Sequence, residues 1–156
     1  MQTRMFCGLT VWCAFAMLSA AQAENWPGWR GPRGDGSSEE NKVPVVWSET
    51  EHVAWKVKIP HGGHSSPIVF GNRVFLVGAK TGDQPSRVLM CLDFATGKLL
   101  WEKVVVESPL EKKHQLNSWA SGTPVTDGEK IYVSFLDQKE MLVAAYDFDG
   151  QLLDRK

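Results

Sequence analysis

The chain has few cysteines, and two of the three, Cys7 and Cys13, lie within the first 23 residues. Cys91 is the only one in the remainder, which excludes an internal disulfide there. Because it stands in an apolar run, we expect it to be a small buried hydrophobic residue. Acidic and basic residues nearly balance, with a formal net charge of −1. Without a basic stripe or interleaved aromatic residues, the sequence predicts no nucleic-acid partner.

Long hydrophobic runs are also scarce. Residues 1–23 carry Arg4 as their only charge, an apolar stretch over 9–18, and Ala21-Gln22-Ala23 before Glu24. This pattern is typical of a secretory signal peptide cleaved after Ala23, with an uncleaved anchor as the alternative. No later segment approaches the roughly 20 apolar residues of a membrane-spanning helix. We therefore expect an exported protein of the periplasm, cell envelope or extracellular space, without a transmembrane segment after cleavage.

One stretch, residues 89–101, predicts a strand, a tight turn and a returning strand. Asp93 can accept hydrogen bonds from backbone donors in the turn, and Gly97 can adopt a positive φ at little steric cost. Trp101 ends the returning strand, where its ring can cover the flank of a neighbouring sheet. A single hairpin cannot bury both of its faces, so the pattern is expected to recur.

The pattern does recur. Residues 66–76 match residues 123–133, and both segments place a turn dipeptide, Gly71-Asn72 or Asp127-Gly128, between apolar runs. Further on, Asp93 corresponds to Asp147 and Gly97 to Gly150. Each copy reads strand, two-residue turn, strand, loop, strand, turn, strand, and four antiparallel strands in about 50 residues indicate a propeller blade. The predicted fold class is all-β: a partial propeller over residues 44–156, with blades near 64–104 and 118–156.

Asp93, Thr96, Gly97 and Trp101, at this spacing, resemble the repeat of the PQQ-like β-propellers, which include quinoprotein alcohol dehydrogenases and the outer-membrane assembly factor BamB. Residues 26–36 (Trp-Pro-Gly-Trp-Arg-Gly-Pro-Arg-Gly-Asp-Gly) are similar to the start of secreted PQQ-like repeat proteins abundant in planctomycetes. His64-Ser65-Ser66-Pro67 and Ala54-Trp55-Lys56 fit the same group. The resemblance implies a ring of seven or eight blades, and hence that this chain is the N-terminal part of a larger protein. A two-blade piece that oligomerises into a ring is the alternative.

The N-terminal region is expected to be an irregular arm over residues 24–43, rich in Gly, Pro, Ser and charge. Trp26 and Trp29 are costly to leave in water, so we expect them to pin the arm to the propeller rim, with ligand stacking as the alternative. Short strands are predicted over 45–47 and 52–59. The resemblance implies that residues 53–59 form the strand that closes the ring.

No catalytic, cofactor-binding or metal-binding residue is assigned from the sequence. His61 and His64 are three apart, but no Cys, Asp or Glu stands close enough in sequence to complete a familiar metal site. If His64 and Ser65 lie where an inner strand begins, they face the channel, and they are the channel-facing candidates. Residues 147–150 lack the spaced carboxylates of a calcium loop and fit a blade turn better. Residues 107–117 are expected to be a solvated connection, with a partner-binding loop as the alternative.

These observations favour a non-catalytic propeller that needs no cofactor and acts as a scaffold, or as a module that binds an envelope protein or a small-molecule ligand. The alternative is part of a PQQ-dependent, alcohol dehydrogenase-like oxidoreductase. The resemblance implies that such an enzyme would hold PQQ and calcium in the channel, beside a vicinal disulfide. The residues after position 23 contain no adjacent cysteines with which to form one.

Overall fold

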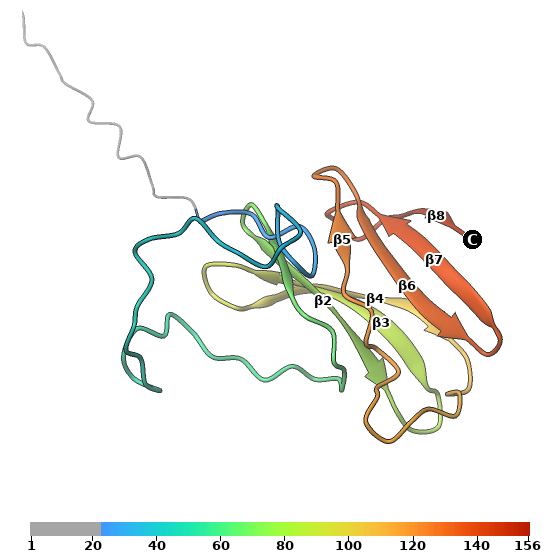
Figure 1. The fold of residues 1–156 in the computed structure, drawn as a ribbon. Coiled ribbons are helices and arrows are strands. Elements are labelled where there is room, and N and C mark those ends of the chain that lie inside the picture. The colour runs from blue at the N-terminus through green and yellow to red at the C-terminus, as the bar shows by residue number, and fades with distance from the viewer. Residues whose placement is uncertain (1–22) are drawn as a thin grey trace, which may run out of the picture.

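The computed structural model describes residues 23–156 (Figure 1), so the predicted signal peptide lies outside the described residues except for its last position. The described chain contains eight strands and no helix. Accordingly, this part of the chain offers no helical segment with the length and apolar character needed to cross a membrane.

The strands form two four-stranded antiparallel sheets, each with its strands in chain order. The first sheet contains β1 (Ile68–Phe70), β2 (Arg73–Lys80), β3 (Ser86–Asp93) and β4 (Leu99–Glu107). The second contains β5 (Val125–Thr126), β6 (Ile131–Asp137), β7 (Glu140–Tyr146) and β8 (Leu152–Arg155). The all-β prediction, with two four-stranded blades, is confirmed.

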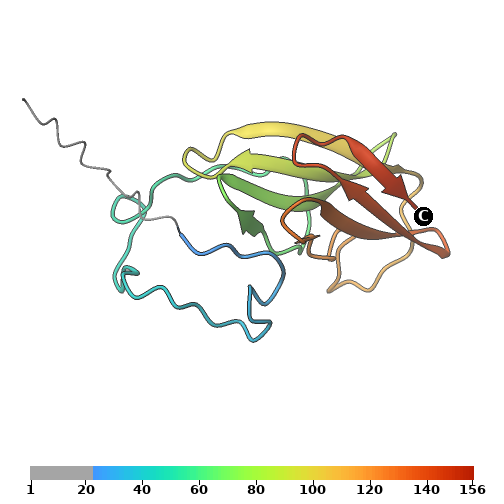
Figure 2. The same cartoon turned by 90° about the horizontal axis from the view of Figure 1, so that it is seen from above.

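The main core lies between the two sheets, which pack against each other (Figure 2). Side chains alternate across a strand, so β2 and β3 each bury one set of residues against the second blade and the other set on the opposite face. Phe75 and Cys91 belong to the first set, and both are fully buried. Val88 and Met90 belong to the second set, against which Ile59 packs. Because both of its faces are covered, β3 is an almost continuous apolar run.

The two inner hairpins have different turns, although the sequence predicted a two-residue turn in each. Phe70 pairs with Arg73, so Gly71-Asn72 is a two-residue turn, in which Gly71 has a φ of 58°. In the second blade, however, Thr126 pairs with Ile131, which leaves four residues in the turn. The two-residue prediction is wrong there.

The longer second turn has a local cause. The Asp127 carboxylate accepts the backbone N–H groups of Glu129 and Lys130, at 2.9 and 2.8 Å, and the Tyr132 hydroxyl at 2.8 Å. These three bonds stabilise the charged form and lower the pKa of Asp127 to about 2.

Only one of the two tryptophans in the N-terminal arm holds it to the blades. Trp26 exchanges two backbone hydrogen bonds with Val69 of β1, at 2.7 and 3.0 Å, and the carbonyl of Pro27 accepts the N–H of Thr126 in β5 at 2.9 Å. The arm therefore bridges the inner strands of both blades. Trp29, in contrast, is 64% exposed and lies against Arg30. The predicted pinning role is wrong for Trp29.

The strands predicted over residues 45–47 and 52–59 do not form, and this includes the closing strand expected over 53–59. A single bridge between Ser48 and Glu51 is the only pairing described in this region. A closing strand must hydrogen bond to the edge of another sheet. Residues 53–59 make no such pairing within the part of the chain that the structure describes.

Candidate functional site at the blade joints and strand starts

The repeat residues of the first blade build a tight turn after β3. The Asp93 carboxylate accepts the N–H of Thr96 at 2.9 Å and its hydroxyl at 2.6 Å. Both bonds lower the pKa of Asp93, and the bond from the Thr96 hydroxyl contributes most. The N–H of Gly97 donates to the Asp93 carbonyl at 2.8 Å, and Gly97 has a φ of 69°. The turn thereby leaves the Phe94 carbonyl and the bare Cα of Gly97 accessible to a neighbour.

Trp55 packs on this turn. Its indole N–H donates to the Phe94 carbonyl at 2.8 Å. The ring lies so close to Gly97 that a Cβ there would be 2.4 Å from Trp55 Cε3. Glycine is therefore required both by the positive φ and by contact with the indole.

Trp101 of β4 makes the same contacts with the second blade. Its indole N–H donates to the Phe148 carbonyl at 3.0 Å. Its ring covers Gly150, which has a φ of 80° and at which a Cβ would lie 3.0 Å from Trp101 Cδ2. The turn itself is closed by Asp147, whose carboxylate accepts two backbone N–H groups.

We call the packing of a tryptophan on the turn glycine of the next blade a blade joint. The Trp55–Gly97 and Trp101–Gly150 joints are equivalent, and this equivalence shows where the segment around Trp55 lies relative to the first blade. Trp101 lies on β4, the outer strand of the first blade, and packs on Gly150 of the second blade. Trp55 packs on Gly97 of the first blade in the same way. Residues 53–59 thus occupy the position of an outer strand beside the first blade, without strand pairing. The series changes at β8, where Asp154 stands at the repeat position of Trp101.

A buried ion pair also joins the blades. The Arg87 side chain is fully buried at the start of β3 and pairs with Glu111 in the loop between the blades. Its guanidinium also donates to the Ser108 carbonyl at 3.1 Å and to the Leu136 carbonyl of β6 at 3.3 Å. Burial opposes the ionisation of Glu111, but bonds from the Gln138 N–H and from Arg87 outweigh it and lower its pKa. This ion pair holds the connecting loop against both blades.

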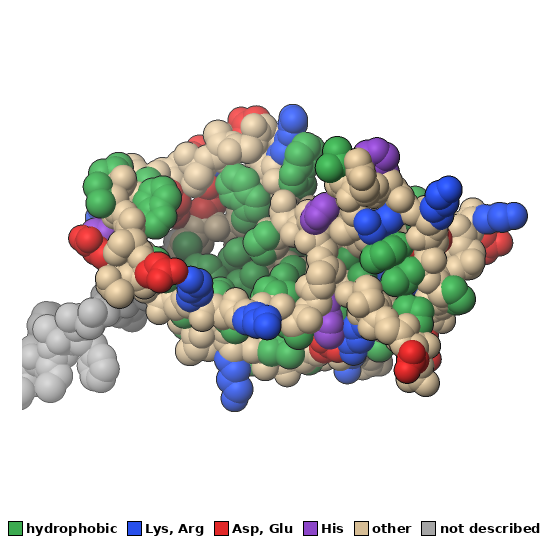
Figure 3. All heavy atoms as spheres, turned by 90° about the horizontal axis from the view of Figure 1, so that it is seen from below, with side chains coloured by type: hydrophobic (Ala, Val, Ile, Leu, Met, Phe, Trp, Pro, Cys, Tyr) green, Lys and Arg blue, Asp and Glu red, His purple; other side chains and the backbone are tan. Residues whose placement is uncertain are grey.

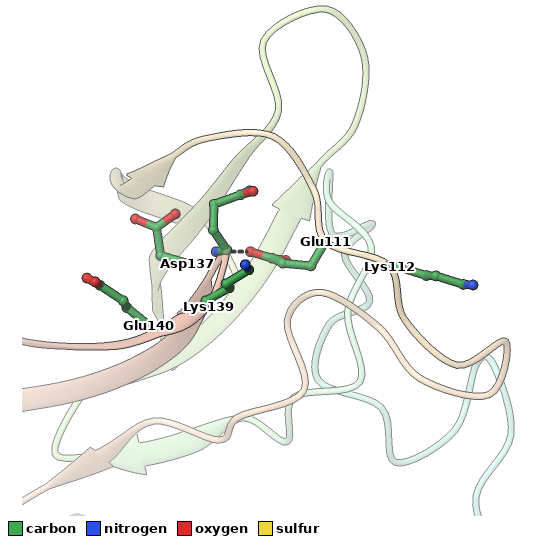
Figure 4. A pocket seen from close by; sticks show the side chains of 6 residues that line it. Glu111, Lys112, Asp137, Lys139 and Glu140 are labelled. Atoms are coloured by element: carbon green, nitrogen blue, oxygen red, sulfur yellow. Dashed lines mark hydrogen bonds between the residues drawn. The ribbon is translucent and has the colours of Figure 1, made fainter.

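Glu111 also lines a cavity of about 530 Å³ beside the β6–β7 turn (Figure 4). Its carboxylate is directed at the Gln138 backbone, 2.8 Å away. Asp137 and Glu140 lie to one side of it, whereas Lys112 points away to the other. These side chains diverge, so the cavity presents no convergent set of ligands.

The histidine pair considered from the sequence is divided between two environments. His61 Nε2 lies 2.7 Å from Glu102, whose other carboxylate oxygen is 2.6 Å from Lys80 Nζ. Burial opposes the ionisation of Glu102, and the bonds from Lys80 and His61 outweigh it and lower the pKa. His64 instead lines a separate pocket. The two imidazoles therefore do not share a site.

His64 and Ser65 lie where the first inner strand begins, next to the corresponding segment of the second blade. Their backbone N–H groups both donate to the Ala120 carbonyl, at 3.0 and 3.1 Å. The N–H of Ser66 donates to the hydroxyl of Thr123, which is its counterpart in the repeat, at 3.2 Å. The strand starts of the two blades are thus tied together, while the His64 side chain remains exposed.

The described residues do not fit the calcium site that the resemblance to quinoprotein dehydrogenases implied. Calcium takes six to eight oxygen ligands, largely carboxylates. Over residues 23–156 no three side chains of His, Cys, Asp or Glu converge. Cys91 is buried in β3, where burial raises the pKa of its thiol.

Comparison with known proteins matches residues 37–155 to a family model described as the outer membrane protein assembly factor BamB. The chain belongs to this family. The match spans both blades and the segment that carries Trp55, so the BamB-like family and the observed fold agree. No curated protein matches the chain significantly.

Several contacts at these joints were missed by reasoning from the sequence. Arg87 was not singled out, although it is the only charged residue between the start of β3 and Asp93. The prediction of a solvated connection over residues 107–117 is wrong for Glu111, which is largely buried and pairs with Arg87. Trp119 was not considered, and its indole donates to the Glu111 carbonyl at 2.7 Å. A lone cation in an otherwise buried strand is the signal that could have indicated the ion pair, because buried charges are usually paired.

Proposed function

We propose that this chain is a non-catalytic propeller unit of the cell envelope, acting as a scaffold or as a module that binds a protein or a small molecule. The observation that supports it most is that charged side chains at the blade interface pair with one another across it. Arg87 and Glu111 tie the connecting loop to both blades, and Arg73 of the first blade pairs with Asp149 of the second at 3.1 Å. These groups stabilise the assembly of the blades and are not free to act on a substrate.

Export is part of the same proposal. It is supported by the charge and hydropathy pattern of residues 1–23 and by membership of the BamB-like family. We expect the species recovered from the cell envelope to begin at Glu24. N-terminal sequencing of the protein from fractionated cells tests this, and a cytoplasmic species that retains Met1 would contradict it.

The catalytic alternative is tested on the full chain with PQQ and calcium. The protein is incubated with both, freed of unbound cofactor by gel filtration, and assayed for dye-linked alcohol oxidation. We expect no stoichiometric retention of PQQ and no dye reduction above that of the protein without PQQ. Retention at one equivalent together with alcohol-dependent dye reduction would overturn the non-catalytic proposal.

A further inference from the structure

A pocket of about 310 Å³ lies between the start of the first blade and the loop that connects the blades. Its lining comes from three stretches of the chain and includes His64, Lys113, Asn117, Ser118 and Trp119. Figure 3 shows the molecule from below, with lysine, arginine and histidine side chains spread over that face among apolar ones. The volume is at the lower limit for small-molecule sites, so the pocket suits a ligand of a few heavy atoms.

Trp119 and Lys113 form one wall of the pocket. The indole is fixed by its bond to the Glu111 carbonyl, and Lys113 Nζ lies 4.7 Å above the centre of the ring. Lys113 is half-buried, and within residues 23–156 it forms no ion pair. Its ammonium donates one long hydrogen bond, of 3.5 Å, to the His114 carbonyl, and no acidic side chain among the residues that line the pocket balances its charge.

Asn117, on the same loop, and His64, before β1, also line the pocket and supply further hydrogen-bond donors. The Asn117 side-chain oxygen accepts the N–H of Ser118 at 2.8 Å and the hydroxyl of Ser121 at 2.6 Å. Both lone pairs of that oxygen are thus occupied, and its NH₂ group is left without a protein partner among the described residues. The imidazole of His64 also makes no hydrogen bond within that part of the chain, because its contacts there are through the backbone.

The available groups are thus predominantly donors, and one of them carries a positive charge. A lysine ammonium donates three hydrogen bonds and accepts none, and the free amide NH₂ donates two. Among the residues that the structure describes, none that line the pocket is acidic. A ligand rich in acceptors and negatively charged satisfies these groups, whereas a cation does not.

We propose that this pocket binds a small oxyanion-bearing ligand, a carboxylate or a phosphate, with Lys113 as its counter-ion, Asn117 and His64 as donors, and the Trp119 ring as its apolar wall. The proposal rests on the proposed function, because it names the ligand class for a binding module.

The test is an NMR titration of the full-length chain, labelled with ¹⁵N, at low ionic strength. Succinate and inorganic phosphate are the probes, tetramethylammonium is the cationic control, and the indole N–H resonance of Trp119 is followed. We expect saturable shifts with at least one of the anions and none with the cation. Saturation by succinate alone assigns a carboxylate ligand, and saturation by phosphate alone assigns a phosphate ligand.

A pair of adjacent lysines provides the matched control. Lys113→Met removes the charge that faces the pocket and retains most of the side-chain length, and we expect at least tenfold weaker binding. Lys112→Met removes the same charge from a side chain that lines a different cavity, and we expect less than a twofold change. Equal losses in both variants would overturn the proposal, because they would indicate attraction to net charge alone.

A second variant protects the test if Lys113→Met fails to fold. Asn117→Asp keeps the two acceptor contacts with Ser118 and Ser121 but replaces the free donors by a negative charge, so we expect binding to be abolished. Unchanged binding in this variant, or no saturable shift in the unsubstituted chain, would overturn the proposal. The two proposals fail separately. Absence of anion binding would overturn the pocket proposal and leave the scaffold proposal unaffected. PQQ-dependent dye reduction would overturn the scaffold proposal and leave the anion-binding proposal unaffected.

Discussion

Substituting the glycine of one blade joint separates the cost of backbone conformation from the cost of contact with the indole. Gly97 and Gly71 both have a positive φ, of 69° and 58°. A Cβ at Gly71 meets nothing within 4 Å, whereas a Cβ at Gly97 would lie 2.4 Å from the Trp55 ring. Gly71→Ala therefore measures the conformational cost alone, and Gly97→Ala adds the displacement of Trp55.

The expected magnitudes follow from these two contributions. Placing alanine in the left-handed region costs about 1–2 kcal/mol. Displacing Trp55 removes its hydrogen bond to Phe94, worth about 1 kcal/mol, and part of the burial of its ring. We expect Gly97→Ala to reduce the free energy of unfolding by about 2 kcal/mol more than Gly71→Ala, within the range of coupling energies for residues in contact.

The assay is urea denaturation followed by far-ultraviolet circular dichroism, which does not depend on tryptophan emission. With a slope of about 1–3 kcal/mol per molar urea, the difference between the two variants moves the midpoint by roughly 1 M. In a Trp55→Ala background the extra cost of Gly97→Ala should disappear. Equal midpoints for Gly71→Ala and Gly97→Ala, or an extra cost that persists without Trp55, would refute the reasoning.

Three further perturbations address the other contacts. Trp101→Ala should cost about 3 kcal/mol, because the half-buried ring fills the joint between the blades, whereas Trp29→Ala, at an exposed ring, should stay within about 0.5 kcal/mol. Arg87→Met should lower the free energy of unfolding by about 3–5 kcal/mol, because it leaves Glu111 unpaired. Adding Glu111→Gln to this variant should restore part of that stability. NMR titration of Asp127 should give a pKa of about 2; because this lies below the unfolded value, its stabilising contribution is present above about pH 4 and lost as pH falls toward 2.

Each of these has a contrary outcome. Equal midpoints for Trp101→Ala and Trp29→Ala would argue that the indole at the joint contributes no more than a surface residue. Full stability of Arg87→Met would show that the buried pair does not brace the loop. An Asp127 pKa near the usual value for aspartate would mean that its three hydrogen bonds do not persist in solution.

The fold could be predicted from the sequence because its determinants are local and repeated. Asp93, Thr96 and Gly97 specify a turn through contacts within a few residues, and the same pattern recurs at Asp147 and Gly150. The alternation of apolar residues in the strands then requires two packed sheets.

The pairing of segments distant in the sequence could not be predicted in the same way. Trp55 and Phe94 are 39 residues apart, and Arg87 contacts Leu136 across the blade interface. The strand expected over 53–59 shows the limit clearly, because its side-chain pattern is that of a strand while the hydrogen-bonding edge it needs is not formed by the described residues. Local patterns specify what a segment can become, and its tertiary partners decide whether it does.

The indole-on-glycine joint also bears on how such chains evolve. Trp101 belongs to one blade and Gly150 to the next, so a blade that carries both an outer tryptophan and a turn glycine can follow any blade of the same kind. Duplicating or deleting such a unit leaves a tryptophan beside a glycine at the new junction. The second blade has Asp154 where the first has Trp101, so a blade inserted directly after the second blade would meet no indole at the new junction.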